Sequence, residues 1–358
     1  MVKFECDTRV LQNATMKSIK AAGFNKMIPL TGMIGIGSCG DRVTLTSTDG
    51  TNYLYVDIDL DIDDDFSVVV DAEKFSKLVS KLTSDTVELV VSEDSLIVNS
   101  NGEYKLALQL SDDGSVLEFP TPIMSAKVDF DKSVKVDKSV IDVMLNSIKP
   151  SLSTQSGNVY SNYYVGDVIV GTDRAMFSSF NNSSFGSTRL LSREFVDLLG
   201  LMPDDTVEIV FGEDEVVANS GNLSLYAKQS ASTEGFNADK ISEIISTEMD
   251  SFCRVNKQAL LSALERIAIF VGEFDETATK LRFTPDGLEI SSMNTSGVET
   301  VDYMEFMFDA EFSAKISITR FITLLKSYGS DSVDIYFGNA KMLKLKDGKL
   351  TQVIAYML

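Results

Sequence analysis

A glycine-rich segment near the N-terminus is the first place where residue type and spacing could do chemistry. Gly35, Gly37 and Gly40 match the GxGxxG pattern with which dinucleotide-binding folds hold a pyrophosphate at a helix N-terminus. That function requires a strand before the pattern and a helix after it, whereas residues 41–46 alternate like a strand. We therefore interpret the segment as a hairpin loop and not as a nucleotide site.

Aspartates alternate with aliphatic residues from Asp57 to Asp63, and the first three have the spacing of calcium ligands. A calcium loop would need glycine where Ile62 stands and glutamate where Val68 stands. The strict alternation instead predicts a half-buried strand with an acidic outer face.

The sequence contains no histidine, which removes the commonest general base and the commonest transition-metal ligand. Neighbouring carboxylates such as Asp204 and Asp205 lie in turn-like sequence. An enzyme with a carboxylate site is therefore an alternative function that no motif supports. We expect no catalytic residue, no metal and no cofactor. Cys6, Cys39 and Cys253 are odd in number and widely spaced, which predicts reduced thiols.

Basic residues gather on segments with helical periodicity. The chain has 53 acidic and 32 basic residues and a net charge of −21, yet its six predicted helices together carry more basic than acidic residues. These helices are expected at residues 7–24, 71–83, 137–150, 190–202, 256–271 and 317–328. In the second, Lys74, Lys77 and Lys81 share one side. Its apolar residues form the opposite, buried side: Phe75, Leu78, Val79 and Leu82. Such a face is either an ordinary solvated surface or a surface for phosphates.

The elements that carry these helices repeat three times. A helix followed by a strand recurs at residues 71–91, 191–211 and 317–337, and a repeat of about 120 residues is too long for a solenoid unit. Another helix with strands precedes each copy, which predicts an α+β fold of helices packed on small antiparallel sheets. The expected domains are residues 1–122, 123–247 and 248–358. The linkers are expected at residues 118–122 and 233–251, the second with a short helical stretch.

In length, order and spacing the sequence resembles the bacterial DNA polymerase III β subunit, the β sliding clamp family. Four stretches carry the resemblance: Met27–Met33, Glu118–Pro120, Val170–Phe177 and Val353–Leu358. The resemblance implies three similar clamp domains, each with two helices packed on antiparallel sheets, and a closed ring formed by a head-to-tail homodimer. It also implies a non-catalytic protein that encircles duplex DNA without sequence specificity and tethers polymerase to it.

The DNA-facing residues implied by the resemblance come from the helices and from the loop after the first one. They are Lys17, Lys20, Lys26, Lys74, Lys77, Lys81, Lys149, Arg193, Lys257, Arg266, Arg320 and Lys326. A sliding ring needs positive charge near phosphates but no base readout, because hydrogen bonds to bases would fix it in place. The third repeat has Arg320 and Lys326 on a helix without acidic residues, whereas Arg193 is set against Glu194 and Asp197 in the second. We therefore expect the second domain to contribute least to holding DNA.

The resemblance further implies an apolar groove between domains 2 and 3 that takes short peptides from polymerases and the clamp loader. Its expected lining is Tyr163, Thr172, Arg174, Ala175, Met176, Phe177, Ile244, Met342 and Ile354. The chain departs from the family here, because Ala175 replaces the usual His, Met176 the usual Arg and Ala355 the usual Pro. These departures favour a different peptide and a divergent or phage-encoded member.

Ring closure is implied to join domain 1 of one chain to domain 3 of the other. The resemblance places Tyr104, Leu106 and Leu108, on an edge strand, against Ile269 and Phe270. An exposed edge with alternating apolar residues needs a partner in any case. Packing in the chain's own core is the alternative for these five side chains.

The N-terminus has no apolar signal region, and no run of about 18 apolar residues occurs. We expect a cytoplasmic protein associated with the nucleoid, or one in the host cytoplasm if it is phage-encoded. The alternative function is an acidic scaffold or decoy that keeps the clamp fold and binds replication proteins without loading on DNA.

Overall fold

The computed structural model describes residues 2–60, 62, 65–111, 114–122, 130–155, 157–271 and 278–357. The chain divides into two compact units: residues 1–138 with 194–231, and residues 139–193 with 232–358. Helices and antiparallel sheets repeat three times along it, so the predicted α+β class is confirmed. No helix in the described part of the chain is long and apolar enough to cross a membrane.

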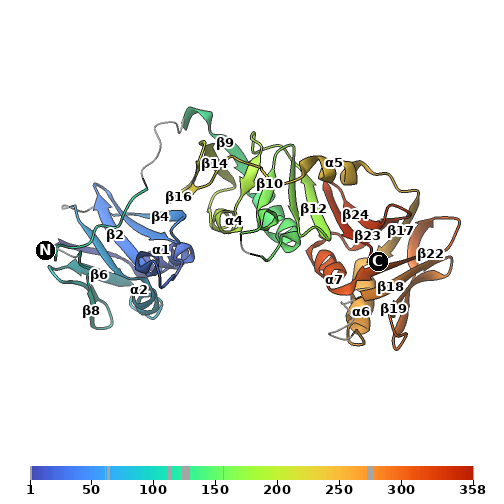
Figure 1. The fold of residues 1–358 in the computed structure, drawn as a ribbon. Coiled ribbons are helices and arrows are strands. Elements are labelled where there is room, and N and C mark those ends of the chain that lie inside the picture. Colours follow the sequence, from blue (N-terminus) through green and yellow to red (C-terminus); the bar gives the residue numbers. More distant parts are fainter. Residues whose placement is uncertain are drawn as a thin grey trace. The chain divides into compact units, whose positions relative to one another are not determined.

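The predicted helices are all present (Figure 1). In the described residues the α-helices are α1 (Thr8–Ser18), α2 (Ala72–Val79), α3 (Lys138–Val143), α4 (Arg193–Leu199), α5 (Ala238–Ser246), α6 (Lys257–Ala268) and α7 (Ile318–Ser327). Side chains at the N-caps accept bonds from free backbone N–H groups and so define the starts: Asp7, Asp71, Asn237, Asn256 and Ser317. Helix α3 continues as a π-turn at Met144–Ile148 and a 3₁₀ turn at Lys149–Ser151.

The first unit contains an eight-stranded sheet and a four-stranded sheet. The larger has the order β5-β2-β3-β4-β16-β15-β14-β9 and the smaller β1-β6-β7-β8. Their strands are β1 (Val2–Asp7), β2 (Met33–Cys39), β3 (Arg42–Thr48), β4 (Asn52–Asp59), β5 (Ser67–Asp71), β6 (Thr86–Val91), β7 (Ser95–Asn99), β8 (Glu103–Ala107), β9 (Val134–Asp137), β14 (Thr206–Phe211), β15 (Glu215–Ser220) and β16 (Leu223–Lys228).

The second unit contains a nine-stranded sheet and a four-stranded sheet. Their orders are β13-β10-β11-β12-β25-β24-β23-β17-β21 and β20-β19-β18-β22. The strands are β10 (Tyr163–Val165), β11 (Val168–Thr172), β12 (Met176–Asn181), β13 (Arg189–Leu191), β17 (Ser251–Asn256), β18 (Ala278–Thr284), β19 (Gly287–Ser292), β20 (Val298–Val301), β21 (Tyr303–Met307), β22 (Phe312–Ser317), β23 (Ser332–Phe337), β24 (Met342–Asp347) and β25 (Leu350–Ala355).

Each large sheet joins strands of one repeat to strands of the next. The first repeat joins the second where β4 pairs with β16, and the second joins the third where β12 pairs with β25. In the third repeat β20 has the place that β4 and β12 have in the first and second. In the first repeat β8 has the place that β16 and β25 have in the second and third. Each of β20 and β8 is an edge of a four-stranded sheet.

Two sequence interpretations concern the strands of the first repeat. The hairpin predicted for the glycine segment is present, but its loop is shorter than expected: Gly35 and Gly37 lie in β2, and only Gly40, with φ of 63°, lies in the turn before β3. The strand predicted over residues 57–63 ends earlier, at Asp59, so that prediction is wrong beyond this point. Ile58 is buried and Asp59 exposed, which confirms the alternation there. Asp61 and Asp63 lie outside the described residues.

In each repeat the first helix donates a side-chain hydrogen bond to the C-terminal carbonyls of the second. The bonds join Gln12 to Val79 and Leu82 (3.0 Å each), Lys138 to Gly200 (2.6 Å) and Lys257 to Tyr328 (2.9 Å). Carbonyls at a helix end have no partner within the helix, so these bonds satisfy them. Helix α1 packs against α2, and α6 against α7 (Figure 1).

Cys6 and Cys253 are buried free thiols. Burial raises the pKa of the Cys6 thiol to about 11, and it raises the pKa of the Cys253 thiol as well. Both are therefore protonated at neutral pH.

Candidate functional site

A groove of about 380 Å³ lies in the second unit, where the β11–β12 turn, strands β24 and β25 and helix α5 meet. Its lining is Arg174, Ala175, Met176, Phe177, Lys240, Glu243, Ile244, Thr247, Ala340, Lys341, Met342, Val353 and Ala355. Phe177, Met342 and Val353 belong to an apolar cluster that also includes Phe236 and Ile241. The groove thus has an apolar floor.

The rim of the groove is charged. Lys240 and Glu243, one turn apart on α5, form an ion pair of 2.8 Å. Arg174 and Lys341 form no ion pair with any described residue, and both have left-handed backbone, with φ of 77° and 59°. Only two other non-glycine residues in the described part of the chain have positive φ. Strained backbone is enriched at functional sites, so Arg174 and Lys341 make the rim a candidate functional site.

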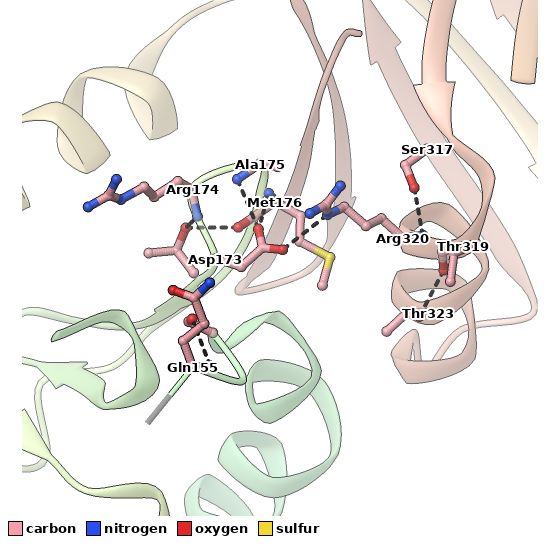
Figure 2. Close-up of polar contacts among 11 residues, drawn as sticks. Gln155, Asp173, Arg174, Ala175, Met176, Ser317, Thr319, Arg320 and Thr323 are labelled. Carbon is pink, nitrogen blue, oxygen red and sulfur yellow. Dashed lines mark hydrogen bonds and ion pairs between the residues drawn. The ribbon is translucent and has the colours of Figure 1, made fainter. Parts of the chain in front are cut away.

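The β11–β12 turn that carries Arg174 is held by its own side chains (Figure 2). Thr172 Oγ1 accepts a bond from the Arg174 N–H (2.9 Å) and donates to the Met176 carbonyl (2.8 Å). Asp173 Oδ1 accepts from the backbone N–H groups of Ala175 (2.9 Å) and Met176 (2.8 Å). The Arg174 guanidinium lies 4.9 Å from the centroid of the Tyr160 ring, within cation–π range.

The first repeat contains the same turn with glycine at the strained position. Thr48 and Asp49 make the equivalent bonds, and Gly50, with φ of 98°, stands where the second repeat has Arg174. Glycine adopts this conformation without steric penalty, whereas arginine does not. Arginine at position 174 therefore carries a conformational free-energy penalty that glycine would not have.

A buried lysine anchors the wall that α5 forms. Lys344, on β24, is only 2% exposed, and its Nζ donates to the carbonyls of Ile245 (3.0 Å) and Thr247 (2.5 Å) at the end of α5. Burial, and next the charge of Lys346, lower the pKa of Lys344. The sequence offers no signal for this role, because an alternating strand predicts only which face a lysine occupies.

The predicted DNA-facing residues divide by whether a carboxylate neutralises them. Five have neither an ion pair nor a side-chain hydrogen bond to any described residue: Lys17, Lys20, Lys26, Lys74 and Lys81. All five belong to the first repeat. Lys77 pairs with Glu73 at 2.5 Å, but both side chains are exposed. Lys149 is half-buried at the start of its 3₁₀ turn.

In the third repeat the basic residues on the helices are paired with acids from other elements. Arg266 binds Glu299 (2.5 Å), Arg320 binds Asp173 (3.0 Å) and Lys326 binds Glu265 (2.9 Å). Helix α7 contains no acidic residue, as the sequence shows, yet acids from other elements pair with Arg320 and Lys326. Helix packing brings acids from distant sequence to these cations.

Two predicted DNA-facing residues bond to backbone carbonyls within their own unit. Lys257 bonds to the Tyr328 carbonyl and thereby caps α7. Arg193 Nη2 donates to the Ser153 carbonyl (3.3 Å), and its Nε is buried without a partner. Each bond satisfies a main-chain carbonyl and leaves the side chain with further donors.

The residues predicted for ring closure lie at two sheet edges. Tyr104 and Leu106 are on β8, and Tyr104 is 39% exposed. Ile269 and Phe270 follow α6 and are 78% and 48% exposed. Leu108 lies beyond the end of β8 and is buried, so its expected place on the exposed edge is wrong.

Comparison with known proteins reveals relatives over nearly the whole chain. Residues 2–119 match the model of the DNA polymerase III beta subunit, N-terminal domain. The beta sliding clamp of Chlamydia muridarum is 21% identical over 308 residues, which cover 81% of this chain and 80% of the relative. That of Chlamydia trachomatis is 21% identical over 309 residues, 82% of this chain and 71% of the relative.

Solved structures match the fold from end to end. The sliding clamp of Bacillus subtilis has a TM-score of 0.86 at 19% identity, covering 100% of this chain and 99% of that one. DNA polymerase III subunit beta of Borrelia burgdorferi has a TM-score of 0.86 at 17% identity, with all of both chains covered. The chain is thus similar to β sliding clamps in its N-terminal domain sequence, in two relatives of low identity and in its whole fold. At these identities the structures themselves establish the fold alone.

Six of the nine groove residues predicted from the clamp resemblance line the groove: Arg174, Ala175, Met176, Phe177, Ile244 and Met342. Three do not. Tyr163 is fully buried and donates to the Met144 carbonyl, and Thr172 is used within the turn. Ile354 points into the core on the other face of β25.

The groove is also lined by residues that were not among those predicted from the resemblance. Val353 and Ala355 flank Ile354, and they line the groove because side chains alternate along a strand. That alternation could have identified them. Lys240, Glu243, Thr247, Ala340 and Lys341 come from elements whose approach only the fold reveals.

Proposed function

We propose that this chain is a DNA sliding clamp and polymerase processivity factor, which encircles duplex DNA and holds replication proteins in the groove of its second unit. The observation that carries the proposal is the pairing pattern of the sheets. Strand β4 joins the first repeat to the second, and β12 joins the second to the third. Continuing the pattern, β20 joins the third repeat to a first repeat, whose free edge is β8.

The partner of each edge is a second copy of the chain. Because β20 and β8 are different surfaces, the contact is head-to-tail, and such contacts form a ring when the rotation closes. Exposed apolar residues lie at or beside both edges: Tyr104, Ile269, Phe270 and Val298. We infer a homodimeric ring with clamp domains at residues 1–122, 123–247 and 248–358.

The charge on the helices supports contact with phosphates. In a chain of net charge −21, the unpaired cations of the first repeat provide sequence-independent attraction without base readout. The first domain is thus the main source of this attraction. The second domain is still expected to contribute least, and the pairing of Arg266, Arg320 and Lys326 with acids weakens the third.

The groove suits short peptides with apolar side chains, which its floor would bury. We propose that polymerase and clamp loader bind there through such segments. The proposed role is binding and not catalysis, and it belongs in the cytoplasm with the replicating DNA. A clamp-fold decoy would bind the same partners but would not encircle DNA.

The test is retention on DNA of two topologies. Protein is incubated at high concentration with a nicked circular plasmid, and gel filtration then separates bound from free protein at moderate salt. We expect retention on the circle and loss after one restriction cut, because a ring leaves through free ends. The double variant Lys74→Gln/Lys81→Gln should load less. Equal retention on circle and linear DNA would contradict the ring, and binding to neither would favour the decoy.

A further inference from the structure

Arg320 connects the proposed DNA-facing helix α7 to the peptide groove. Its Nε donates to Asp173 Oδ2 at 3.0 Å, and the two side chains are 40% and 18% exposed. Figure 2 shows the guanidinium reaching from α7 to the β11–β12 turn beside Met176. Met176 lines the groove, so the ion pair ends directly behind the groove wall.

Asp173 uses its two carboxylate oxygens for different purposes. Oδ1 closes the turn by accepting from Ala175 and Met176, while Oδ2 receives Arg320. The matching residue of the first repeat, Asp49, also closes its turn with Oδ1, but its Oδ2 accepts from the neighbouring Asn52 amide (2.7 Å). Tying the turn to a distant helix is therefore a feature of the groove turn and not a requirement of the turn itself.

The guanidinium of Arg320 has donors to spare. Among the described residues only its Nε makes a hydrogen bond to a side chain, so the two terminal nitrogens donate to no protein group. A guanidinium presents five donors in a fixed fork that fits a phosphate or a carboxylate. A partly exposed ion pair contributes little net free energy, so a phosphate can replace Asp173 at little cost.

We propose that Arg320 is a positioning residue for the peptide groove, and that a DNA phosphate competes with Asp173 for it. DNA in the ring then releases the turn of residues 172–176 from α7. The inference rests on the proposed function, because it needs DNA to pass along α7. Coupling of this kind is reciprocal, so a partner that orders the turn returns Arg320 to Asp173 and lessens the hold on DNA at this position.

The experiment is hydrogen–deuterium exchange of the full-length protein with and without nicked circular plasmid, at constant ionic strength. In the wild type we expect DNA to speed exchange of residues 172–177 by about two- to fivefold, the range of a partly exposed ion pair. Arg320→Gln should show the faster exchange without DNA and no further response to it. Asp173→Asn, which can still close the turn through Oδ1, should behave in the same way.

The turn of residues 48–53 in the first repeat is an internal control, because no side chain of a described helix residue bonds to it, and its exchange should not respond to DNA. The proposal is overturned if DNA is retained on the circle but residues 172–177 do not change, or if Arg320→Gln and Asp173→Asn still respond. Failure of the wild type to stay on the circle would overturn the proposed function, and this inference with it.

Discussion

At the scale of single residues, what a cation can do depends on its partner more than on its position in a helix. Lys74 and Lys81 form no ion pair within the described part of the chain, whereas Arg320 is paired with Asp173 and Lys257 bonds to a carbonyl at the end of α7. All four lie in segments that the sequence pattern predicts to be helical. Arg174 stands where the first repeat has Gly50, and both residues have positive φ.

Substitutions at position 174 should reveal backbone strain. Arg174→Ala and Arg174→Gly both lose the stacking on Tyr160, but only glycine relieves the φ of 77°. We expect the glycine variant to be more stable than the alanine variant by about 1 kcal/mol, as measured by urea unfolding. The matched control is Gly50→Ala, where a Cβ meets no atom closer than 3.9 Å, so only the backbone penalty remains. It should lose a similar amount, and equal stability of the two Arg174 variants would exclude strain.

At the scale of elements, a turn, two strands and a helix form the groove, and they are joined by an apolar cluster and a few buried polar contacts. Helix α5 lies within the segment expected as a linker, yet it provides one wall. Its C-terminal carbonyls are held by Lys344 from β24. The wall therefore depends on a strand about a hundred residues away in sequence. Bringing two such segments together costs chain entropy, so the contact forms only when the whole unit folds.

Replacing Lys344 by methionine should detach α5 locally. The change keeps the length of the side chain but leaves the carbonyls of Ile245 and Thr247 without their donor, which costs about 1–3 kcal/mol. We expect faster hydrogen exchange in α5 and little change in the four-stranded sheet of the same unit. Lys346→Met is the control, because Lys346 is exposed on the same strand. Protection of α5 that is equal in both variants would show that Lys344 is not its anchor.

At the scale of the whole molecule, one rule of strand pairing explains both large sheets and leaves two edges open. These edges, β8 and β20, are where a second chain is expected. The net charge of −21 opposes association of two such chains, so apolar contacts at the edges have to overcome it. The exposed Ile269 and Phe270 are the largest apolar surface beside β20.

An aspartate at position 269 should weaken the ring. Native mass measurement should give about twice 39.3 kDa for the wild type, whereas Ile269→Asp should shift the balance toward monomer. A charge buried in an interface costs about 2–5 kcal/mol, so the dissociation constant should rise at least thirtyfold. Met307→Asp, at an exposed position on β21, should stay dimeric. A wild type that is monomeric at micromolar concentration would contradict the ring.

Sequence alone determined the features that are local or periodic. The three repeats, the six predicted helices, the hairpin around Gly40 and the buried face of α2 follow from spacing, because helix and strand periods decide which side chains share a face. The segment Arg174–Phe177 was located in the groove by its resemblance to the family.

The tertiary structure alone decided which charges neutralise each other and which faces meet. It pairs Arg320 with Asp173, turns Arg193 toward the Ser153 carbonyl, and places Val353 in the groove in place of Ile354. Each outcome depends on atoms contributed by elements far apart in the chain. A hydrogen bond needs its two atoms about 3 Å apart, and salt screens exposed charges beyond about 10 Å, so only the packed fold brings such groups within range.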